Sequence, residues 1–316
     1  MSTYLVTGGA GFIGSHIVTA LVERGERVRV LDNLSTGKRE NLAHLGGKVE
    51  LVTGDLVDRA VVDRALQGVG VVFHQAALAS VPRSIEAPLD TNAACVTGTV
   101  NLLDAARKSG VERVVYAGSS SIYGDRTASA AKHEIDLPDP VSPYAAAKAA
   151  GELYCQAFTA AFGLPTVTVR YFNVFGPRQD PNSEYAAVLP KFVMKMLAGE
   201  RPTIFGDGKQ SRDFTYVANI VAGNLLAASV PDAAGKTFNI ACGEKLDLLD
   251  LIAAINRVLG TNIEPIFDPP RAGDVRDSLA DISLARQVLG YQPVIDFDEG
   301  LRRSIEYYRS LAAKKL

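Results

Sequence analysis

The sequence contains no tryptophan and only three cysteines, three methionines and four histidines in 316 residues. Cys95, Cys155 and Cys242 lie far apart and are odd in number, which favours free thiols in a reducing compartment over a disulfide framework. The histidines are equally scattered, so there is neither metal-ligand spacing nor a Ser-His-Asp signature. Basic residues number 33 and acidic residues 35, a balance that predicts neither nucleic-acid nor membrane-surface binding.

The sequence also lacks an apolar run long enough to cross a bilayer and a basic segment at its start. We therefore expect a cytoplasmic protein with no membrane partner. A hydrophobic content of 47% and a charged content of 22% are ordinary for a globular protein. The length allows one large or two modest domains with a buried core.

Short apolar strands alternate with helices through the first half of the chain. Strands are expected at 3–7, 27–32, 49–52, 71–74 and 113–117, with helices to about 24 and over about 58–67 and 90–109. This alternation predicts an α/β fold with a doubly wound parallel (Rossmann) sheet. We expect one domain from 1–173 plus about 213–242. A smaller, interleaved C-terminal α/β domain would comprise about 174–212 plus 243–316.

Glycines occupy the first strand-to-helix turn at Gly8, Gly11 and Gly14. They permit a tight turn, let backbone N–H groups approach a pyrophosphate and allow close helix packing. Asp32 ends the second strand near the ~20-residue offset of the acid that binds the adenosine ribose. The carboxylate favours NAD over NADP, although Lys38 and Arg39 follow in the next loop.

Further binding positions follow from later strand ends. The Asp55 carboxylate could meet the adenine amino group, and small residues follow the strand at 71–74 in Gln75-Ala76-Ala77. Ser119, Ser120 and Ser121 end the strand at 113–117, where one hydroxyl could bind a substrate hydroxyl.

Tyr144 and Lys148 lie four residues apart after the helix-start signal Ser142-Pro143. Such residues share one helix face. A nearby ammonium favours the phenolate, so the spacing predicts a Tyr144 pKa below its ordinary value and a role in proton transfer.

These motifs together resemble the extended short-chain dehydrogenase/reductases and, within them, the UDP-hexose 4-epimerases. The later segments Arg170–Asn182, Tyr185–Pro190, Gly206–Phe214 and Arg271–Ser278 are similar to the branch acting on UDP-GlcNAc and UDP-GalNAc. The resemblance implies an NAD-dependent epimerase that oxidises and re-reduces sugar C4. It also implies a homodimer formed through helices at about 93–109 and 144–162.

The resemblance implies residue roles as well. Tyr144 would be the acid/base, Lys148 would hold the nicotinamide ribose, and Ser119 would assist at the sugar O4, beside Ser120 and Ser121. Further cofactor-binding positions would be Phe12, Ile13, Asn33, Ser35, Thr36, Gly37, Leu56, Asn92 and Tyr171. The UDP-sugar would meet Ser80, Ser119, Asn173, Ala187, Val188, Lys191, Thr203, Phe205, Arg212, Arg271, Asp274 and Ser278, with Arg212 and Arg271 on the phosphates.

Sister reactions stay open at this point. Related 4,6-dehydratases carry an Asp-Glu pair where this chain has Ser120 and Ser121, which disfavours dehydration. A UDP-glucuronate 4-epimerase or decarboxylase shares the first oxidation, but no basic residue for a sugar carboxylate is evident. A non-catalytic NAD sensor or scaffold is disfavoured because Tyr144, Lys148 and Ser119 are all present. Ser278 stands where epimerases that reject acetylated sugars carry tyrosine, and Ala187 and Ser278 favour room for a 2-acetamido group, whereas the Ala79 methyl could trim the pocket.

Overall fold

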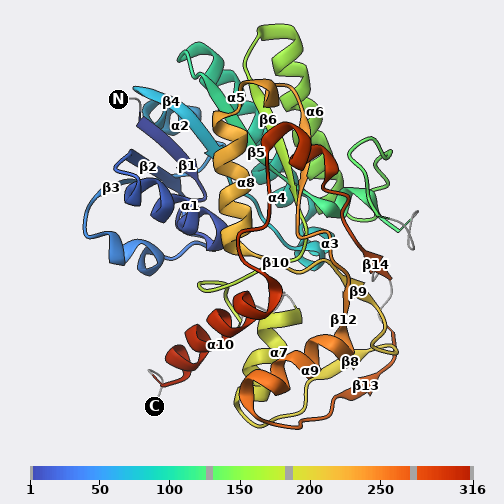
Figure 1. The fold of residues 1–316 in the computed structure, drawn as a ribbon. Coiled ribbons are helices and arrows are strands. Elements are labelled where there is room, and N and C mark those ends of the chain that lie inside the picture. The colour runs from blue at the N-terminus through green and yellow to red at the C-terminus, as the bar shows by residue number, and fades with distance from the viewer. Residues whose placement is uncertain (1–2, 126–130, 182–187, 271–275, 314–316) are drawn as a thin grey trace.

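The computed structural model describes residues 3–125, 131–181, 188–270 and 276–313 (Figure 1). Its main sheet has seven strands in the order β11-β6-β5-β4-β1-β2-β3, and every neighbouring pair is parallel. The strands are β1 (Thr3–Thr7), β2 (Arg27–Asp32), β3 (Val49–Thr53), β4 (Val69–His74), β5 (Arg113–Ser119), β6 (Thr166–Tyr171) and β11 (Thr237–Ile240). The strand order reverses between β1 and β4, which confirms the predicted doubly wound fold and puts the expected ligand crevice at that switch point.

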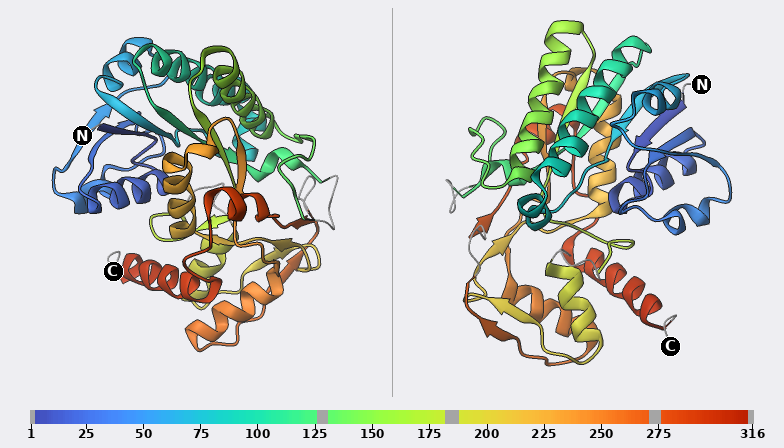
Figure 2. Two further views of the ribbon diagram at one scale, coloured as in Figure 1. Left: turned by 45° about the horizontal axis from the view of Figure 1, so that its top comes forward. Right: turned by 180° about the vertical axis from the view of Figure 1, so that it is seen from behind.

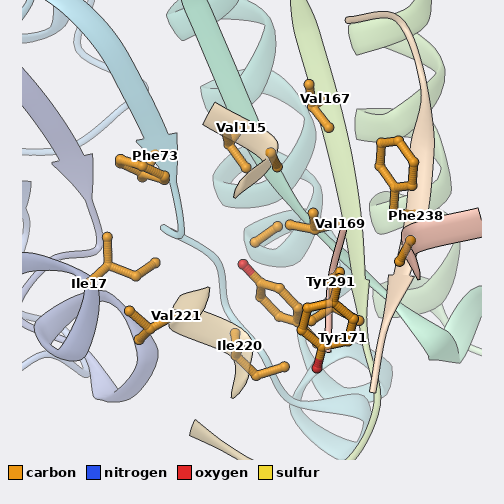
Figure 3. Close-up of a cluster of buried hydrophobic side chains, with 14 of the residues drawn as sticks. Ile17, Phe73, Val115, Val167, Val169, Tyr171, Ile220, Val221, Phe238 and Tyr291 are labelled. Carbon is orange, nitrogen blue, oxygen red and sulfur yellow. The ribbon is translucent and has the colours of Figure 1, made fainter. Parts of the chain in front are cut away.

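Helices cover both faces of this sheet (Figure 2). Helices α1 (Phe12–Glu23) and α8 (Val217–Ser229) pack on one face, and α2 (Arg59–Ala65), α5 (Gly98–Lys108) and α6 (Pro143–Phe162) pack on the other. Successive strand residues point to opposite faces. Val6 and Val115 therefore join the first cluster, drawn in Figure 3, while Leu5 and Val114 join the second. Both faces of the central strands β4 and β5 are buried, so these strands are mostly apolar, whereas the edge strand β3 is half-buried or exposed along its length.

A third apolar cluster lies apart from the main sheet, under the carboxyl ends of its strands (Figure 1). It is built by α7 (Val188–Leu197), α9 (Leu248–Leu259) and α10 (Phe297–Ala313). The apolar residues of α9 recur at helical spacing, and Leu251 and Ile255 are fully buried. Each such side chain contributes about 1.5–3 kcal/mol on burial. This cluster forms the second wall of the cleft, and the division into two sequence domains stays a prediction.

The structure refines several predicted elements. The helix expected at 90–109 is three consecutive pieces: α4 (Pro88–Asn92), a π-helical turn (Ala93–Thr97) and α5. An unpredicted helix α3 (Val81–Glu86) begins at Ser80, whose hydroxyl accepts from the Arg83 N–H. The remaining elements are η1 (Arg39–Leu45), η3 (Ser120–Tyr123), β7 (Val174–Phe175), β8 (Thr203–Phe205), β9 (Ser211–Arg212), β10 (Thr215–Tyr216), η4 (Pro231–Ala233), β12 (Leu246–Asp247), β13 (Ile266–Asp268), β14 (Asp277–Ser278) and η5 (Ala285–Leu289). Among the described residues no helix is long and apolar enough to cross a membrane.

Candidate active site

A cavity of about 980 Å³ runs along the carboxyl ends of the sheet strands and reaches the third apolar cluster. It brings together most of the residues singled out in the sequence. From the first half these are Gly8, Gly11, Phe12, Ile13, Gly14, Asp32, Asn33, Ser35, Thr36, Gly37, Asp55, Leu56, Gln75, Ala76, Ala77, Ser80, Ser119, Ser120 and Ser121. From the second half they are Tyr144, Lys148, Tyr171, Asn173, Val188, Thr203, Phe205, Arg212 and Ser278.

Two predicted positions that the structure describes are not part of this lining. Asn92 ends α4 with its residue exposed, and Lys191 lies on α7 away from the cavity wall. Ala187, Arg271 and Asp274 lie outside the described residues, so their roles stay predictions. Among the described residues, Arg212 represents the predicted phosphate clamp. Within the described parts of the chain, no group of His, Cys, Asp and Glu side chains could hold a metal ion.

The glycine turn leaves a cradle that side chains would fill. Gly8 has φ +66°, and a Cβ there would lie 2.7 Å from the Ala76 nitrogen. A Cβ on Gly14 would lie 2.2 Å from the Gly8 oxygen. Glycine is therefore required at both positions, and backbone N–H groups at the start of α1 stay open to the cavity. This arrangement fits a dinucleotide pyrophosphate.

Asp32 is buried at the end of β2 but still borders the cavity. Its carboxylate accepts hydrogen bonds from the backbone N–H of Ala10 at 2.9 Å and of Leu34 at 2.8 Å. A Cβ on Gly37 would lie 2.8 Å from both carboxylate oxygens, so glycine keeps the loop against the acid. The fixed carboxylate stands where an adenosine ribose would lie and fits NAD.

The two nearby cations are both engaged elsewhere. Lys38 pairs with Asp180 at 2.6 Å, and Arg39 donates to the Thr53 hydroxyl at 3.0 Å. The Lys38 charge is thus balanced by a carboxylate, even though Lys38 borders the cavity. The preference for NAD over NADP, inferred from Asp32, is consistent with this geometry.

The acid/base candidates come from α6 and the end of β5. The Ser142 side chain caps α6 by accepting from the Ala145 N–H, and Tyr144 and Lys148 then face β5. The Lys148 ammonium is buried, donates to the Ala117 carbonyl at 2.8 Å and lies 5.0 Å from the Tyr116 ring centre.

Burial raises the pKa of Tyr144 above its ordinary value, and a hydrogen bond with Ser119 acts in the opposite direction. The lowering expected from the Tyr144–Lys148 spacing is therefore not found in the protein alone. Burial also lowers the pKa of Lys148. Loss of hydration outweighs the proximity of the ammonium, since it disfavours the charged form of each group.

Hydroxyl and amide groups complete this end of the cavity. The Ser119 hydroxyl lies 2.8 Å from that of Ser121, which pre-orients both. The Tyr171 hydroxyl lies 3.1 Å from Gln75 Oε1 and 3.0 Å from Asn224 Oδ1. The groups bonded to Tyr171 are thus neutral amides. A serine hydroxyl cannot replace a carboxylate in proton transfer, and this holds for Ser119, Ser120 and Ser121.

Arg212 and Ser278 are brought into register across neighbouring strands. They pair directly between β9 and β14. Asp213, fully buried, holds this region by accepting from the N–H groups of Cys242 at 3.0 Å, Gly243 at 2.9 Å and Ala280 at 3.3 Å. Burial raises the Asp213 pKa to about 6 even though these bonds favour the carboxylate.

Several lining residues had no role in the sequence prediction. Lys132 borders the cavity, and Arg178, Gln179 and Asp180 enter it from the loop after β7, opposite Asn41. The Gly176-Pro177-Arg178 motif marked this loop as distinctive. No local pattern indicated that it would meet the glycine turn.

Comparison with known proteins identifies the family. The family model described as "NAD dependent epimerase/dehydratase family" matches residues 4–241. The chain belongs to this family. It is 41% identical over 311 residues to a UDP-glucose 4-epimerase of Mycolicibacterium smegmatis, covering 97% of this chain and 98% of that protein.

Solved structures agree with this family assignment. A UDP-N-acetylglucosamine 4-epimerase from Methanobrevibacter ruminantium, in complex with UDP-N-acetylmuramic acid, is 41% identical with a TM-score of 0.94 and covers 98% of this chain and 99% of its own. A UDP-glucuronic acid 4-epimerase from Bacillus cereus, in complex with UDP-glucuronic acid and NAD, is 31% identical with a TM-score of 0.91 and covers 98% and 99%. The chain is thus an NAD-dependent enzyme of the UDP-sugar epimerase group, and the resemblance drawn from its motifs is confirmed.

Proposed function

We propose that this epimerase inverts C4 of UDP-Glc/UDP-Gal and of UDP-GlcNAc/UDP-GalNAc through a transient 4-keto sugar. One observation carries the proposal. Tyr144, Lys148 and Ser119 line the same cavity as the glycine turn on one side and Arg212 on the other. A nucleotide sugar whose diphosphate lies at Arg212 would direct its hexose toward the phenol.

The chain's own residues supply proton transfer and orientation. Tyr144 takes the proton from the sugar O4 and returns it after inversion, and Ser119 holds O4 in hydrogen-bonding reach. Lys148, fixed by Ala117, orients the cofactor ribose and balances the phenolate. When bound, NAD⁺ would accept hydride from C4, return it to the other face and place a positive charge beside Tyr144.

We propose that the uridine end of the UDP-sugar binds at the cavity wall formed by the third apolar cluster. Thr203 and Phe205 lie on β8, and Val188 begins α7, all bordering the cavity. Arg212 suits a diphosphate because its guanidinium offers a planar fork of donors. Asn173 borders the same region. Arg271 and Asp274 are proposed partners for the nucleotide or sugar on the basis of the motif alone.

Ser278 supports a cavity that accepts sugars with a 2-acetamido group. Its small side chain borders the cavity opposite the Arg212 strand, which supports room for a 2-acetamido group. A UDP-glucuronate 4-epimerase is the second candidate, and the Bacillus cereus relative supports it. Lys132 also gives this candidate a basic residue in the cavity wall, although Asp125, Asp136 and Asp277 lie close enough to influence its charge.

Dehydration remains disfavoured. It requires an additional acid and base at the sugar, whereas the corresponding positions carry Ser120 and Ser121, and Ser121 is bonded to Ser119. A non-catalytic NAD-binding role is disfavoured by the placement of Tyr144 and Lys148 in the cavity.

A homodimer and a cytoplasmic location are part of the proposal. Ile85, Leu89 and Leu153 are exposed apolar residues on α3, α4 and α6, and these helices contact one another. Exposed apolar side chains on adjoining helices are typical of a protein interface. A second copy of the chain would cover them.

The test is conversion of a panel of UDP-sugars, including UDP-glucuronate, by the purified protein and by Tyr144→Phe. We expect the variant to keep its bound NAD and to lose at least 10²-fold in turnover, because proton transfer at O4 is removed. Tyr154→Phe, an exposed tyrosine on the same helix, is the control and should keep full activity. Equal turnover of the Tyr144 variant and the unmodified protein would overturn the proposal.

A further inference from the structure

The loop after β7 lies across the first turns of α1, although more than 150 residues separate the two in the chain. This strap, residues 176–180, begins at Gly176 with φ +153° and continues through Arg178 with φ +67°. A bulky side chain seldom adopts such a φ, so surrounding contacts must hold Arg178 in place. Those contacts are made with the cofactor-binding part of the molecule.

The Arg178 guanidinium joins the strap to α1 and to η1. Nη1 donates to the Ser15 carbonyl at 3.0 Å, the Thr19 hydroxyl at 3.2 Å and the Asn41 carbonyl at 3.3 Å. Nη2 donates to His16 Nδ1 at 3.1 Å. A cation with three partners on the helix that follows the glycine turn and a fourth on η1 fixes the strap against that turn.

His16, on α1, also forms a hydrogen bond to the strap. Its Nε2–H donates to the Pro177 carbonyl at 2.9 Å, which leaves Nδ1 as the acceptor for Arg178. Burial and the charge of Arg178 lower the His16 pKa to about 4, so the ring is neutral near pH 7. The neutral ring is the form that can accept from Arg178 and donate to Pro177 at the same time.

A second contact joins the far end of the strap to the loop after Asp32. Asp180 accepts from Lys38 at 2.6 Å, and the Lys38 N–H donates to the Ala10 carbonyl at 2.9 Å. The strap is thereby tied to the helix, to η1 and to the ribose-side loop. All three border the cofactor end of the cavity.

The strap itself forms part of the cavity wall. Arg178, Gln179 and Asp180 line it together with Gly11 and Asn41. Gln179 Nε2 donates to the Val174 carbonyl at 3.1 Å, but its buried Oε1 has no hydrogen-bond partner among the described residues. A buried acceptor without a donor at a cavity wall is a position that a ligand or water can satisfy.

We propose that Arg178 is a positioning residue that retains the dinucleotide, by holding the strap across the start of α1 so that NAD leaves only after the strap detaches. This inference rests on the proposed function in one respect: a reaction that restores NAD⁺ in each cycle benefits from a cofactor that stays bound. Asp180 and Lys38 supply a weaker second attachment. Retention is a property of the protein–NAD complex and does not depend on which sugar is converted.

The experiment measures NAD release from the loaded protein after dilution, without any sugar present. Arg178→Met removes the guanidinium and keeps much of the side-chain volume. We expect release at least tenfold faster, since several charge-assisted hydrogen bonds are lost, and activity of the diluted variant that depends on added NAD⁺. Arg178→Lys should restore part of the retention. Arg257→Met, at an exposed position of α9, is the control and should release NAD at the unmodified rate.

The Lys38–Asp180 ion pair allows a second, independent experiment if Arg178→Met fails to fold. Lys38→Asp and Asp180→Lys should each speed release about two- to fivefold, because exposed pairs contribute little, and the double reversal should return the rate toward normal. The proposed role of the strap would be overturned by unchanged NAD release in Arg178→Met. It would also be overturned if the double charge reversal failed to restore the release rate of the single reversals. Faster NAD release in Arg178→Met, together with no conversion of any UDP-sugar by the unmodified protein, would support the role of the strap and refute the proposed function.

Discussion

Glu152 and Arg170 form an ion pair in the interior, and removal of the acidic partner should destabilise the protein strongly. Glu152 lies about one turn after Lys148 on α6, and its oxygens accept from Arg170 Nη2 at 2.6 Å and Nε at 3.0 Å. The side chains are only 4% (Arg170) and 6% (Glu152) exposed. Arg170 also donates to the Tyr123 hydroxyl at 2.6 Å and to the Glu134 carbonyl at 3.2 Å. The pair thus joins α6, β6 and η3 beneath the catalytic groups.

Glu152→Gln keeps the shape of the side chain but removes the only carboxylate that is hydrogen-bonded to the buried guanidinium among the described residues. Breaking one partner of such a pair costs about 3–5 kcal/mol, much more than the pair contributes when intact. At about 2 °C per kcal/mol for a chain of this size, the melting temperature should fall by about 6–10 °C. The hydroxyl of Tyr123 and the carbonyl of Glu134 offset only part of this loss, because neither carries a full charge.

Thermal unfolding with saturating NAD measures the effect. Asp298→Asn is the matched control, since its pair with Arg257 spans 3.7 Å and the two side chains are 70% (Arg257) and 72% (Asp298) exposed. This exposed pair should contribute less than about 1 kcal/mol. A Glu152→Gln shift no larger than that of the control would refute the reasoning. That result would mean that neutral hydrogen bonds are enough to stabilise the buried Arg170 guanidinium.

Three further outcomes are expected. Ser278→Tyr should lower kcat/KM for UDP-GlcNAc at least tenfold relative to UDP-Glc, measured by chromatography of both products; an equal effect on the two sugars would contradict the size argument. Leu153→Glu should convert the dimer to a monomer by light scattering, while Val294→Glu should not, although the two residues are 61% and 60% exposed. Burial lowers the pKa of His16 to about 4 and of His74 to about 3, below the ordinary 6.5. The stability gained by keeping the two rings neutral is complete above pH 6.5 and declines as the pH falls toward 4, whereas the raised pKa of Asp213 acts in the opposite direction. The urea midpoint of His16→Gln should therefore lose less between pH 6.5 and pH 4 than that of the unmodified protein measured in parallel.

The local part of the site could be predicted because its signals lie within single turns. Gly8, Gly14 and Asp32 are fixed by one βαβ unit, and the structure brings them to one cavity wall. Ser142 caps α6 as its position before Pro143 predicted. Such contacts depend on neighbours a few residues away, which periodicity and cap preferences describe well.

The strap was not predicted because its contacts are long-range. Arg178 and His16 are 162 residues apart, and neither residue type indicates the other. The pairing of Ser278 with Arg212 likewise depends on two-residue strands, too short to show alternation. Motif resemblance could mark these segments as parts of the site. The contacts between them are a property of the folded chain.

The pKa of Tyr144 shows why spacing alone misjudges a buried pair. The four-residue spacing predicts only the attraction between a phenolate and an ammonium, which lowers the pKa of a phenol. In the folded protein, loss of hydration raises the pKa of Tyr144 and lowers that of Lys148, so each group is pushed toward its neutral form. Because burial disfavours the charged form of both groups, the attraction between a phenolate and an ammonium does not set the Tyr144 pKa in the protein alone. Under the proposed mechanism, Tyr144 is a poor base until the positive charge of an oxidised cofactor enters the cavity, which would couple proton removal from O4 to the presence of that cofactor.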